Sequence, residues 1–355
     1  QNGGNIVVDN TGDLKTTGKI ITAANGNISL KAAGSETIGA AVTAGGSGNV
    51  TLQADGADSN IAINADVSST SGQITAQAGK NIGIGAAVDT TGNVALTAGG
   101  SIAETDPGKI SNAALLTTTS KGSQTLKGLN TVHSLNATNS GTGDIELVNT
   151  ANPLTITGIS QNGGNIVVDN TGDLKTTGAI TTAANGNVSL KAAGSETIDA
   201  NITAGGSGNV TLQANGTSSD ITINDAVSSS TGKITANAGK DIAIASTVVT
   251  TGNADLTAGG NITESGAGKI TNVSLLTTTS EGSQTLKGQN TVQSLHAMNS
   301  GTGDIELVNT AGLLTITGMT QTAGGDIAVN NTGDIKTTGA ISTAADGNIS
   351  LTAAG

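Results

Sequence analysis

The chain repeats itself on two length scales. Residues 1–160 align without a gap with residues 161–320, and about three quarters of the positions are identical. A third copy begins at Gln321, takes one extra residue near Ala323 and continues to Gly355. Within each copy a shorter pattern recurs: a glycine, a polar residue, then two aliphatic residues separated by one other. Such nested repetition constrains the fold strongly, because a short repeat can bury its apolar face only against its neighbours.

The short pattern returns about every 23 residues and predicts short β-strands. Between glycines the aliphatic residues alternate with polar ones, and Gly, Asn and Asp bound each run, as in strands with one buried face. Its occurrences begin at Gly4, Gly26, Gly48, Gly72, Gly92, Gly122 and Gly143, and again at Gly164. The residues expected to point inward are Ile28, Leu30, Ile38, Val42, Val50, Leu52, Ile61, Ile63 and Val67, and in the opening stretch Ile6, Val8 and Leu14.

The composition permits only a thin core. The chain has no Phe, Tyr, Trp or Cys, and its positive side chains are all Lys; it has 53 Gly among 355 residues. Aliphatic side chains alone fill an interior one or two side chains across. Repeating strands without a separate core predict an all-β fold, a right-handed parallel β-helix (β-solenoid) with 20–24 residues per turn and roughly fifteen turns. We expect one continuous solenoid: cassette 1 at 1–160, cassette 2 at 161–320, and the start of cassette 3 at 321–355.

One interval departs from this spacing. The pattern at Gly92 is followed only at Gly122, so Ser101–Ser123 and its counterpart Asn261–Ser283 are expected to form an oversized turn, or a full turn and part of another. Leu115 and Leu116 are adjacent, which interrupts the alternation. The sequence therefore predicts a corner or a bulge there. A protruding contact loop that recurs with each cassette is the alternative.

Charge and apolar content exclude several classes of partner. The formal net charge is −12, which disfavours nucleic acid and anionic lipid. No apolar run is long enough for a transmembrane helix, so we expect no membrane insertion. Without Cys there is no disulfide framework and no thiolate metal site. No signal peptide is visible and the pattern is cut at both ends, which suggests a segment of a longer protein.

The repeat itself tests candidate catalytic residues, because a working site should keep its reactive groups in each copy. Neither histidine does: His133 corresponds to Gln293, and His296 to Asn136. Asp55, Asp58, Asp66, Asp89 and Asp106 also change. The carboxylates that persist fall in different turns without an Arg or aromatic platform. We therefore expect no enzyme, no catalytic residue and no cofactor; the persisting carboxylates are Asp9, Asp13, Glu36, Glu104, Asp144 and Glu146, with Asp169, Asp173, Glu196, Glu264, Asp304 and Glu306.

Three weaker signals remain. Asp13 and Asp144 lie in Gly-rich turns, where calcium binding is possible, but the nonapeptide repeat of calcium-binding rolls is absent, and an Asp that caps its own turn is the simpler interpretation. The Asn residues that open many repeats (Asn5, Asn27, Asn49, Asn93) predict a stacked polar ladder or left-handed turn residues. Threonine runs at 117–119 and 277–279 are too unevenly spaced for an ice-binding array. We expect no metal site.

The motifs GNVALTAGGSIAE, AALLTTTSKGSQTLKG and NSGTGDIELVNT, taken together, resemble the repetitive region of filamentous-haemagglutinin-like exoproteins. These are large adhesins of Gram-negative bacteria, secreted by the two-partner route. The resemblance implies a right-handed parallel β-helix that forms the shaft of an extracellular cell-surface fibre and mediates attachment. The alternatives are a self-assembling filament without adhesive specificity and, less favoured, a carbohydrate-active β-helix enzyme. Uncapped turns expose strand edges, so the expected partners are further copies of its own repeats, in end-to-end or lateral assembly, and a ligand on a host or neighbouring cell.

Overall fold

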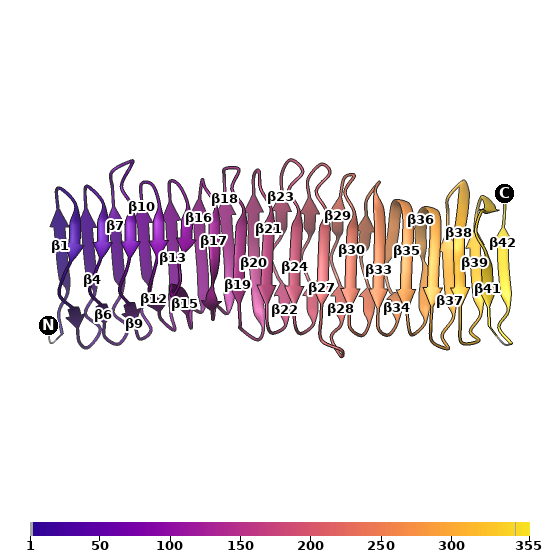
Figure 1. The fold of residues 1–355 in the computed structure, drawn as a ribbon, viewed down its shortest axis with the longest axis horizontal. Helices are drawn as coiled ribbons and strands as arrows, with labels where there is room; N and C mark the ends of the chain where they lie inside the picture. Colours follow the sequence, from indigo (N-terminus) through magenta and orange to yellow (C-terminus); the bar gives the residue numbers. More distant parts are fainter. Residues whose placement is uncertain (1–2, 345) are drawn as a thin grey trace. The chain divides into compact units, whose positions relative to one another are not determined.

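The computed structural model describes residues 3–344 and 346–355 and shows an all-β parallel solenoid of about 16 turns. The predicted fold class is thus confirmed. The chain divides into two compact units, unit 1 (Gln1–Gly172) and unit 2 (Asp173–Gly355). In each unit the strands of successive turns lie side by side (Figure 1). A turn takes between 19 and 25 residues, as the pairs Leu116–Leu135 and Ile38–Ile63 show.

In unit 1 the strands stack in three columns: each turn adds one strand to the first and one to the second, and the first five turns also add one to the third. The first column holds β1 (Ile6–Asn10), β4 (Ile28–Ala32), β7 (Val50–Ala54), β10 (Ile74–Ala78), β13 (Asn93–Ala98), β16 (Leu115–Ser120), β18 (Ser134–Asn139) and β20 (Leu154–Gln161). The second holds β2 (Leu14–Thr16), β5 (Glu36–Ile38), β8 (Ile61–Ile63), β11 (Ile82–Ile84), β14 (Ile102–Glu104), β17 (Gln124–Asn130), β19 (Ile145–Asn149) and β21 (Ile166–Asn170). The third is a five-stranded sheet of β3 (Ile20–Thr22), β6 (Val42–Ala44), β9 (Val67–Ser69), β12 (Ala87–Asp89) and β15 (Lys109–Ser111).

Unit 2 repeats this plan, except that two long strands, β35 (Lys269–Ser280) and β36 (Gln284–Asn299), each run through two columns. Its first column is β24 (Val188–Ala192), β27 (Val210–Ala214), β30 (Ile234–Ala238), β33 (Asn253–Ala258), the ends of β35 and β36, and β38 (Leu313–Gln321). The second is β22 (Leu174–Thr176), β25 (Glu196–Ile198), β28 (Ile221–Ile223), β31 (Ile242–Ile244), β34 (Ile262–Glu264), the start of β36, β37 (Ile305–Asn309), β39 (Ile327–Asn331) and β42 (Ile349–Ala353). The third is β23 (Ile180–Thr182), β26 (Ile202–Ala204), β29 (Val227–Ser229), β32 (Thr247–Val249) and the start of β35; β40 (Asp334–Thr337) and β41 (Ile341–Thr343) pair with β38.

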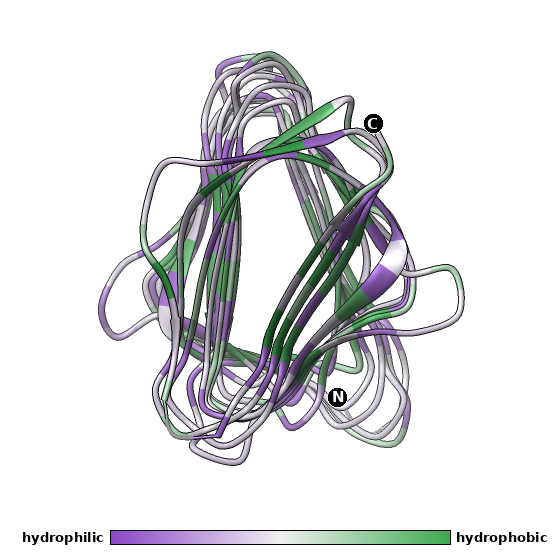
Figure 2. Ribbon diagram, turned by 90° about the vertical axis from the view of Figure 1, so that its right-hand side faces the viewer, coloured by the Kyte–Doolittle hydropathy of each residue, from purple (hydrophilic) through white to green (hydrophobic). Residues whose placement is uncertain are grey.

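The core is the aliphatic ladder that the alternation predicts. In β4 and β7 every second side chain is buried, and the residues between them point outward. Because the strands pair in parallel without a register shift, aliphatic side chains stack on aliphatic ones, Ile28 on Val50 and Leu30 on Leu52. Figure 2 shows hydrophobic stretches along the strands of the turns. All nine residues predicted inward between Ile28 and Val67 are at most 1% exposed.

The opening stretch follows the prediction in its second copy. Ile166, Val168 and Leu174 are buried. In the first copy Leu14 is buried, but Val8 is 36% exposed. The reason is that β1 pairs only with β4 and has no described strand on its other edge.

A cassette does not correspond to a whole number of turns. In unit 1, β1 opens cassette 1 on the first column, whereas the identical segment β21 opens cassette 2 on the second column, paired with β19. In unit 2, β39 opens cassette 3 and pairs with β37, again on the second column. One cassette therefore makes seven turns and advances by one further strand position.

This advance explains the long interval, and the predicted oversized turn is wrong. Ser101–Ser123 forms an ordinary turn, in which Ile102 pairs with Gln124. The short pattern is spaced widely there only because it passes from the first column (β13, after Gly92) to the second (β17, after Gly122). Leu115 does not break the alternation either: it is half-buried and points outward, next to the fully buried Leu116.

Candidate functional site

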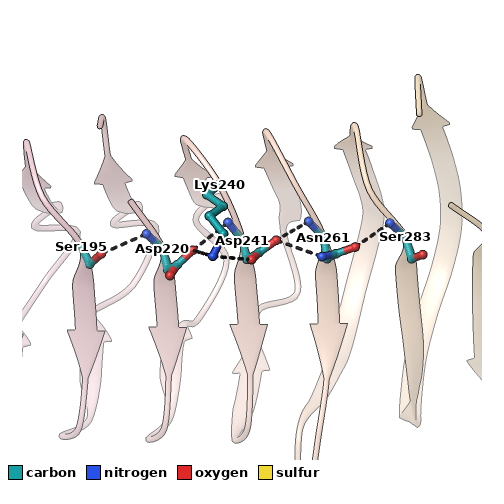
Figure 3. A network of polar contacts seen from close by, with 6 residues as sticks. All are labelled: Ser195, Asp220, Lys240, Asp241, Asn261 and Ser283. Atoms are coloured by element: carbon teal, nitrogen blue, oxygen red, sulfur yellow. Dashed lines mark hydrogen bonds and ion pairs between the residues drawn. The ribbon is translucent and has the colours of Figure 1, made fainter. Parts of the chain in front are cut away.

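Side-chain ladders run along the outside of the turns, where polar residues precede each second-column strand. In unit 2 the oxygen of each residue accepts the backbone N–H of its counterpart one turn later (Figure 3). The distances from nitrogen to oxygen are 3.1, 3.1, 2.6 and 2.8 Å along Ser195, Asp220, Asp241, Asn261 and Ser283. Each side chain thus holds the next turn in register.

Lys240 forms ion pairs with the two adjacent carboxylates of this ladder. Its ammonium lies 3.6 Å from Asp220 and 3.1 Å from Asp241. The hydrogen bond to Asp241, together with both negative charges, raises the pKa of Lys240 above its usual value. In unit 1 the corresponding ladder carries Asn60 and Asn81, which need no cation. These residues link neighbouring turns at the surface, and their role is structural.

The asparagines that open the repeats form a second ladder, as one of the two sequence interpretations predicts. Asn5 accepts the N–H of Asn27 at 2.9 Å, Asn27 that of Asn49 at 2.8 Å, and Asn49 that of Gln73 at 2.7 Å. Asn93 is different: it begins β13 and is exposed. The left-handed turn positions belong to other residues, among them Asn25 and Asn112. The ladder thus repeats the same inter-turn bond on a second edge.

A third ladder consists of buried asparagines, and the sequence did not lead us to predict it. After β15 the third column contains no further strand in unit 1, and amide side chains take over the backbone contacts. Asn130 accepts the N–H of Ile110 at 2.7 Å and donates to the carbonyl of Val148 at 3.1 Å. Asn149 accepts the N–H of Val132 and donates to Asn170. The same arrangement recurs in unit 2 at Asn290, Asn309 and Asn331.

A sequence signal for this ladder exists. Each asparagine of this ladder is followed by threonine, at Asn130, Asn149 and Asn170 and again at Asn290, Asn309 and Asn331. The threonines also bond between turns: Thr150 donates to the carbonyl of Asn130 at 2.9 Å, and Thr310 to that of Asn290 at 2.9 Å. An Asn-Thr pair that recurs once per turn therefore marks an inward amide.

Glu104 and Glu264 each line a recess at corresponding positions of the two units. Glu104 lies in a cavity of about 400 Å³ with Thr105, Lys109 and Lys127, and Glu264 in a smaller one of about 180 Å³. One carboxylate oxygen of Glu104 accepts the N–H of Gly128 at 2.7 Å and the Asn130 amide at 3.1 Å. Burial raises the pKa of Glu104 to about 6, although these two hydrogen bonds lower it. This carboxyl holds the turn at 126–130, and its other oxygen is buried without a hydrogen-bond partner.

The other persisting carboxylates do not converge. Asp13 accepts the N–H of Ser35 at 2.8 Å, and Asp144 that of Asn165 at 2.8 Å, so both join one turn to the next. The expectation that such residues cap their own turn is wrong. Glu146 pairs with Lys127 at 2.8 Å. Within the described ranges no three His, Asp or Glu side chains are grouped so as to hold a metal ion.

The histidines and threonine runs have local roles. His133 and His296 are both exposed, and a ring nitrogen of His133 lies 3.3 Å from the carbonyl of Ala113. Of the run 117–119, the middle residue Thr118 is buried and donates to Gln124 at 2.5 Å. The run is therefore not a flat outward array. In the part of the chain that the structure describes, no helix is long and apolar enough to cross a membrane.

Comparison with known proteins adds no relative. No protein-family model matches the chain, and neither the curated proteins nor the solved structures include one with significant similarity to it. The feature that the two units share is the set of polar ladders that join one turn to the next.

Proposed function

We propose that the chain is the structural shaft of a long extracellular fibre or adhesin on a bacterial cell surface, and mediates attachment by holding a contact site away from the cell. The observation that carries this proposal is the use of the persisting polar side chains. Asp13, Asp144, Asn130 and Asn149 all bond to a neighbouring turn. What the cassettes retain thus supports stacking, and a shaft needs stacking.

The resemblance to filamentous-haemagglutinin-like exoproteins supports the same proposal, and with it an extracellular location and secretion by the two-partner route. A self-assembling filament without adhesive specificity is the alternative. It is favoured by apolar side chains that strands within the repeats turn outward: Leu129 is 72% exposed and Met298 is 42% exposed. Both proposals assign the chain no catalytic activity.

The shaft proposal predicts that reach increases with the number of cassettes. Chains with two or four cassettes would be anchored by the N-terminus to beads that carry a polymer brush of known thickness, with a peptide tag at the C-terminus. Because each cassette adds turns in line, we expect a brush that hides the tag of the two-cassette chain to leave the tag of the four-cassette chain accessible. Antibody capture of the beads measures this.

Capture that does not depend on cassette number would contradict the shaft proposal. The alternative filament is recognised separately, by light scattering from the free chains at rising concentration. Growth into long particles at low concentration, without any dependence of reach on cassette number, would favour it.

A further inference from the structure

The second column of unit 1 contains two polar residues at its inward position. The first residue of each strand points into the core, and successive ones stack directly on one another. Six of the eight are aliphatic, and the exceptions are Glu36 in β5 and Gln124 in β17. From β2 to β21 the column reads Leu14, Glu36, Ile61, Ile82, Ile102, Gln124, Ile145 and Ile166.

These two polar side chains differ in their hydrogen bonding. Gln124 accepts from Thr118 at 2.5 Å and donates to Ser120 at 3.0 Å and to the carbonyl of Thr138 at 2.8 Å. Glu36 is equally buried, at 0% exposure, but neither of its carboxyl oxygens has a hydrogen-bond partner. Burial of an unpartnered polar group costs stability, and burial of an unpaired charge costs far more.

Unit 2 preserves the arrangement. Glu196 lies between Leu174 and Ile221 and is 0% exposed. One of its oxygens accepts the N–H of Gln213 at 3.2 Å, and the other has no partner. Gln284, like Gln124, is fully hydrogen-bonded. The cassettes differ at about a quarter of their positions, so the survival of an unsatisfied core carboxyl in both is a retained feature.

No cation faces Glu36 from the strands around it. On β2, Lys15 points outward and is exposed, and on β4 Lys31 points outward and pairs with Asp55 at 3.1 Å. β7 and β8 carry no charged residue. The carboxylate of Asp13, before β2, accepts a hydrogen bond from the N–H of Ser35. Around Glu196, Lys175 pairs outward with Asp199 at 2.8 Å. Ionisation of either carboxyl would thus leave an uncompensated charge in an aliphatic core.

The direction of the resulting pH dependence follows from burial. Burial raises the pKa of Glu36 to about 8, from 4.5 for an exposed glutamate. The backbone N–H of Gln53 lowers this pKa, but by less than burial raises it, because the N–H is too poorly placed for a hydrogen bond. Burial likewise raises the pKa of Glu196 to about 8. A folded-state pKa above the unfolded one gives stability that is complete below pH 4.5 and is lost progressively as the pH rises to about 8.

We propose that the turns at Glu36 and Glu196 are pH-sensitive opening points built into each cassette. With a protonated carboxyl, β5 and β25 stay packed in the column. When the proton is lost, the strand opens locally so that the carboxylate reaches water, while neighbouring aliphatic turns remain closed. The inference goes beyond the proposed shaft function and does not depend on it. It gives an otherwise uniform solenoid one defined weak point per cassette.

Amide hydrogen exchange of the whole chain between pH 5 and 9 tests this proposal. After correction for the intrinsic exchange rate, we expect the opening constant of β5 and β25 to rise about tenfold per pH unit up to about pH 8. The turns at β11 and β31, whose inward residues are isoleucine, should show no such slope.

Glu36→Gln provides the matched control, because unit 2 of the same chain keeps Glu196. The variant should flatten the slope at β5 and leave the slope at β25 intact. Should Glu36→Gln fold poorly, Glu36→Met, which is unbranched and uncharged, replaces it. Equal slopes at β5 and β11, or an unchanged slope at β5 in Glu36→Gln and Glu36→Met, would overturn the proposal.

Discussion

Ile28→Asp should unfold the first turns of unit 1. Ile28 is 1% exposed and stacks between Ile6 and Val50, so the substitution removes a full aliphatic side chain and places a carboxylate in the ladder. The loss of packing and the buried charge together predict a fall of more than about 4 kcal/mol in the free energy of unfolding of unit 1. Urea denaturation followed by circular dichroism measures it.

Ser29→Asp is the control for this change. Ser29 follows Ile28 on β4 but points outward, between Val7 and Thr51. The same carboxylate in that position should alter the free energy of unfolding by no more than about 0.5 kcal/mol. Equal effects of the two substitutions would show that the inward assignment of the alternating residues is wrong.

Asn130→Leu should have the second largest effect. Leucine matches asparagine roughly in size but leaves the N–H of Ile110 without its acceptor and the carboxyl oxygen of Glu104 without the Asn130 amide. Each buried group that loses its partner costs about 1–3 kcal/mol, so we expect a loss of about 3 kcal/mol in the free energy of unfolding of unit 1. Chemical denaturation of the whole chain, resolved by hydrogen exchange in the segment 104–150, measures this loss.

Asn136→His is the matched control, because the chain itself carries His296 at the corresponding position of unit 2. We expect it to change the free energy of unfolding very little. A small effect of Asn130→Leu, comparable with that of Asn136→His, would mean that the buried amides stabilise the turns only by filling space. Their hydrogen bonds would then contribute little to the free energy of unfolding.

The alternation of aliphatic and polar residues was enough to predict the strands, the parallel solenoid and the inward side chains from Ile28 to Val67. It could not predict the column on which each strand lies. Every column has the same pleat, so the glycine-aliphatic pattern looks the same on all of them. For this reason the passage from the first column at Gly92 to the second at Gly122 resembled an oversized turn. Only the pairing of Ile102 with Gln124 reveals the advance.

The polar side chains were harder to place from sequence. Asn27 and Asn130 are the same residue type at the edge of an alternating run, yet one lies on the surface ladder and the other is fully buried. Which one turns inward depends on whether the neighbouring turns supply a strand or leave backbone groups to be satisfied. Glu36 is the clearest case, because an inward carboxyl contradicts the expectation from hydropathy and only the three-dimensional column shows its position.

The most direct test of the stacked-cassette account is the particle length measured by electron microscopy for chains with two, three and four cassettes. Seven turns and one further strand position per cassette, at about 4.8 Å per turn, predict that each added cassette lengthens the particle by about 35 Å at constant width. Particles whose width grows with cassette number, or whose length does not increase by equal steps, would contradict the account.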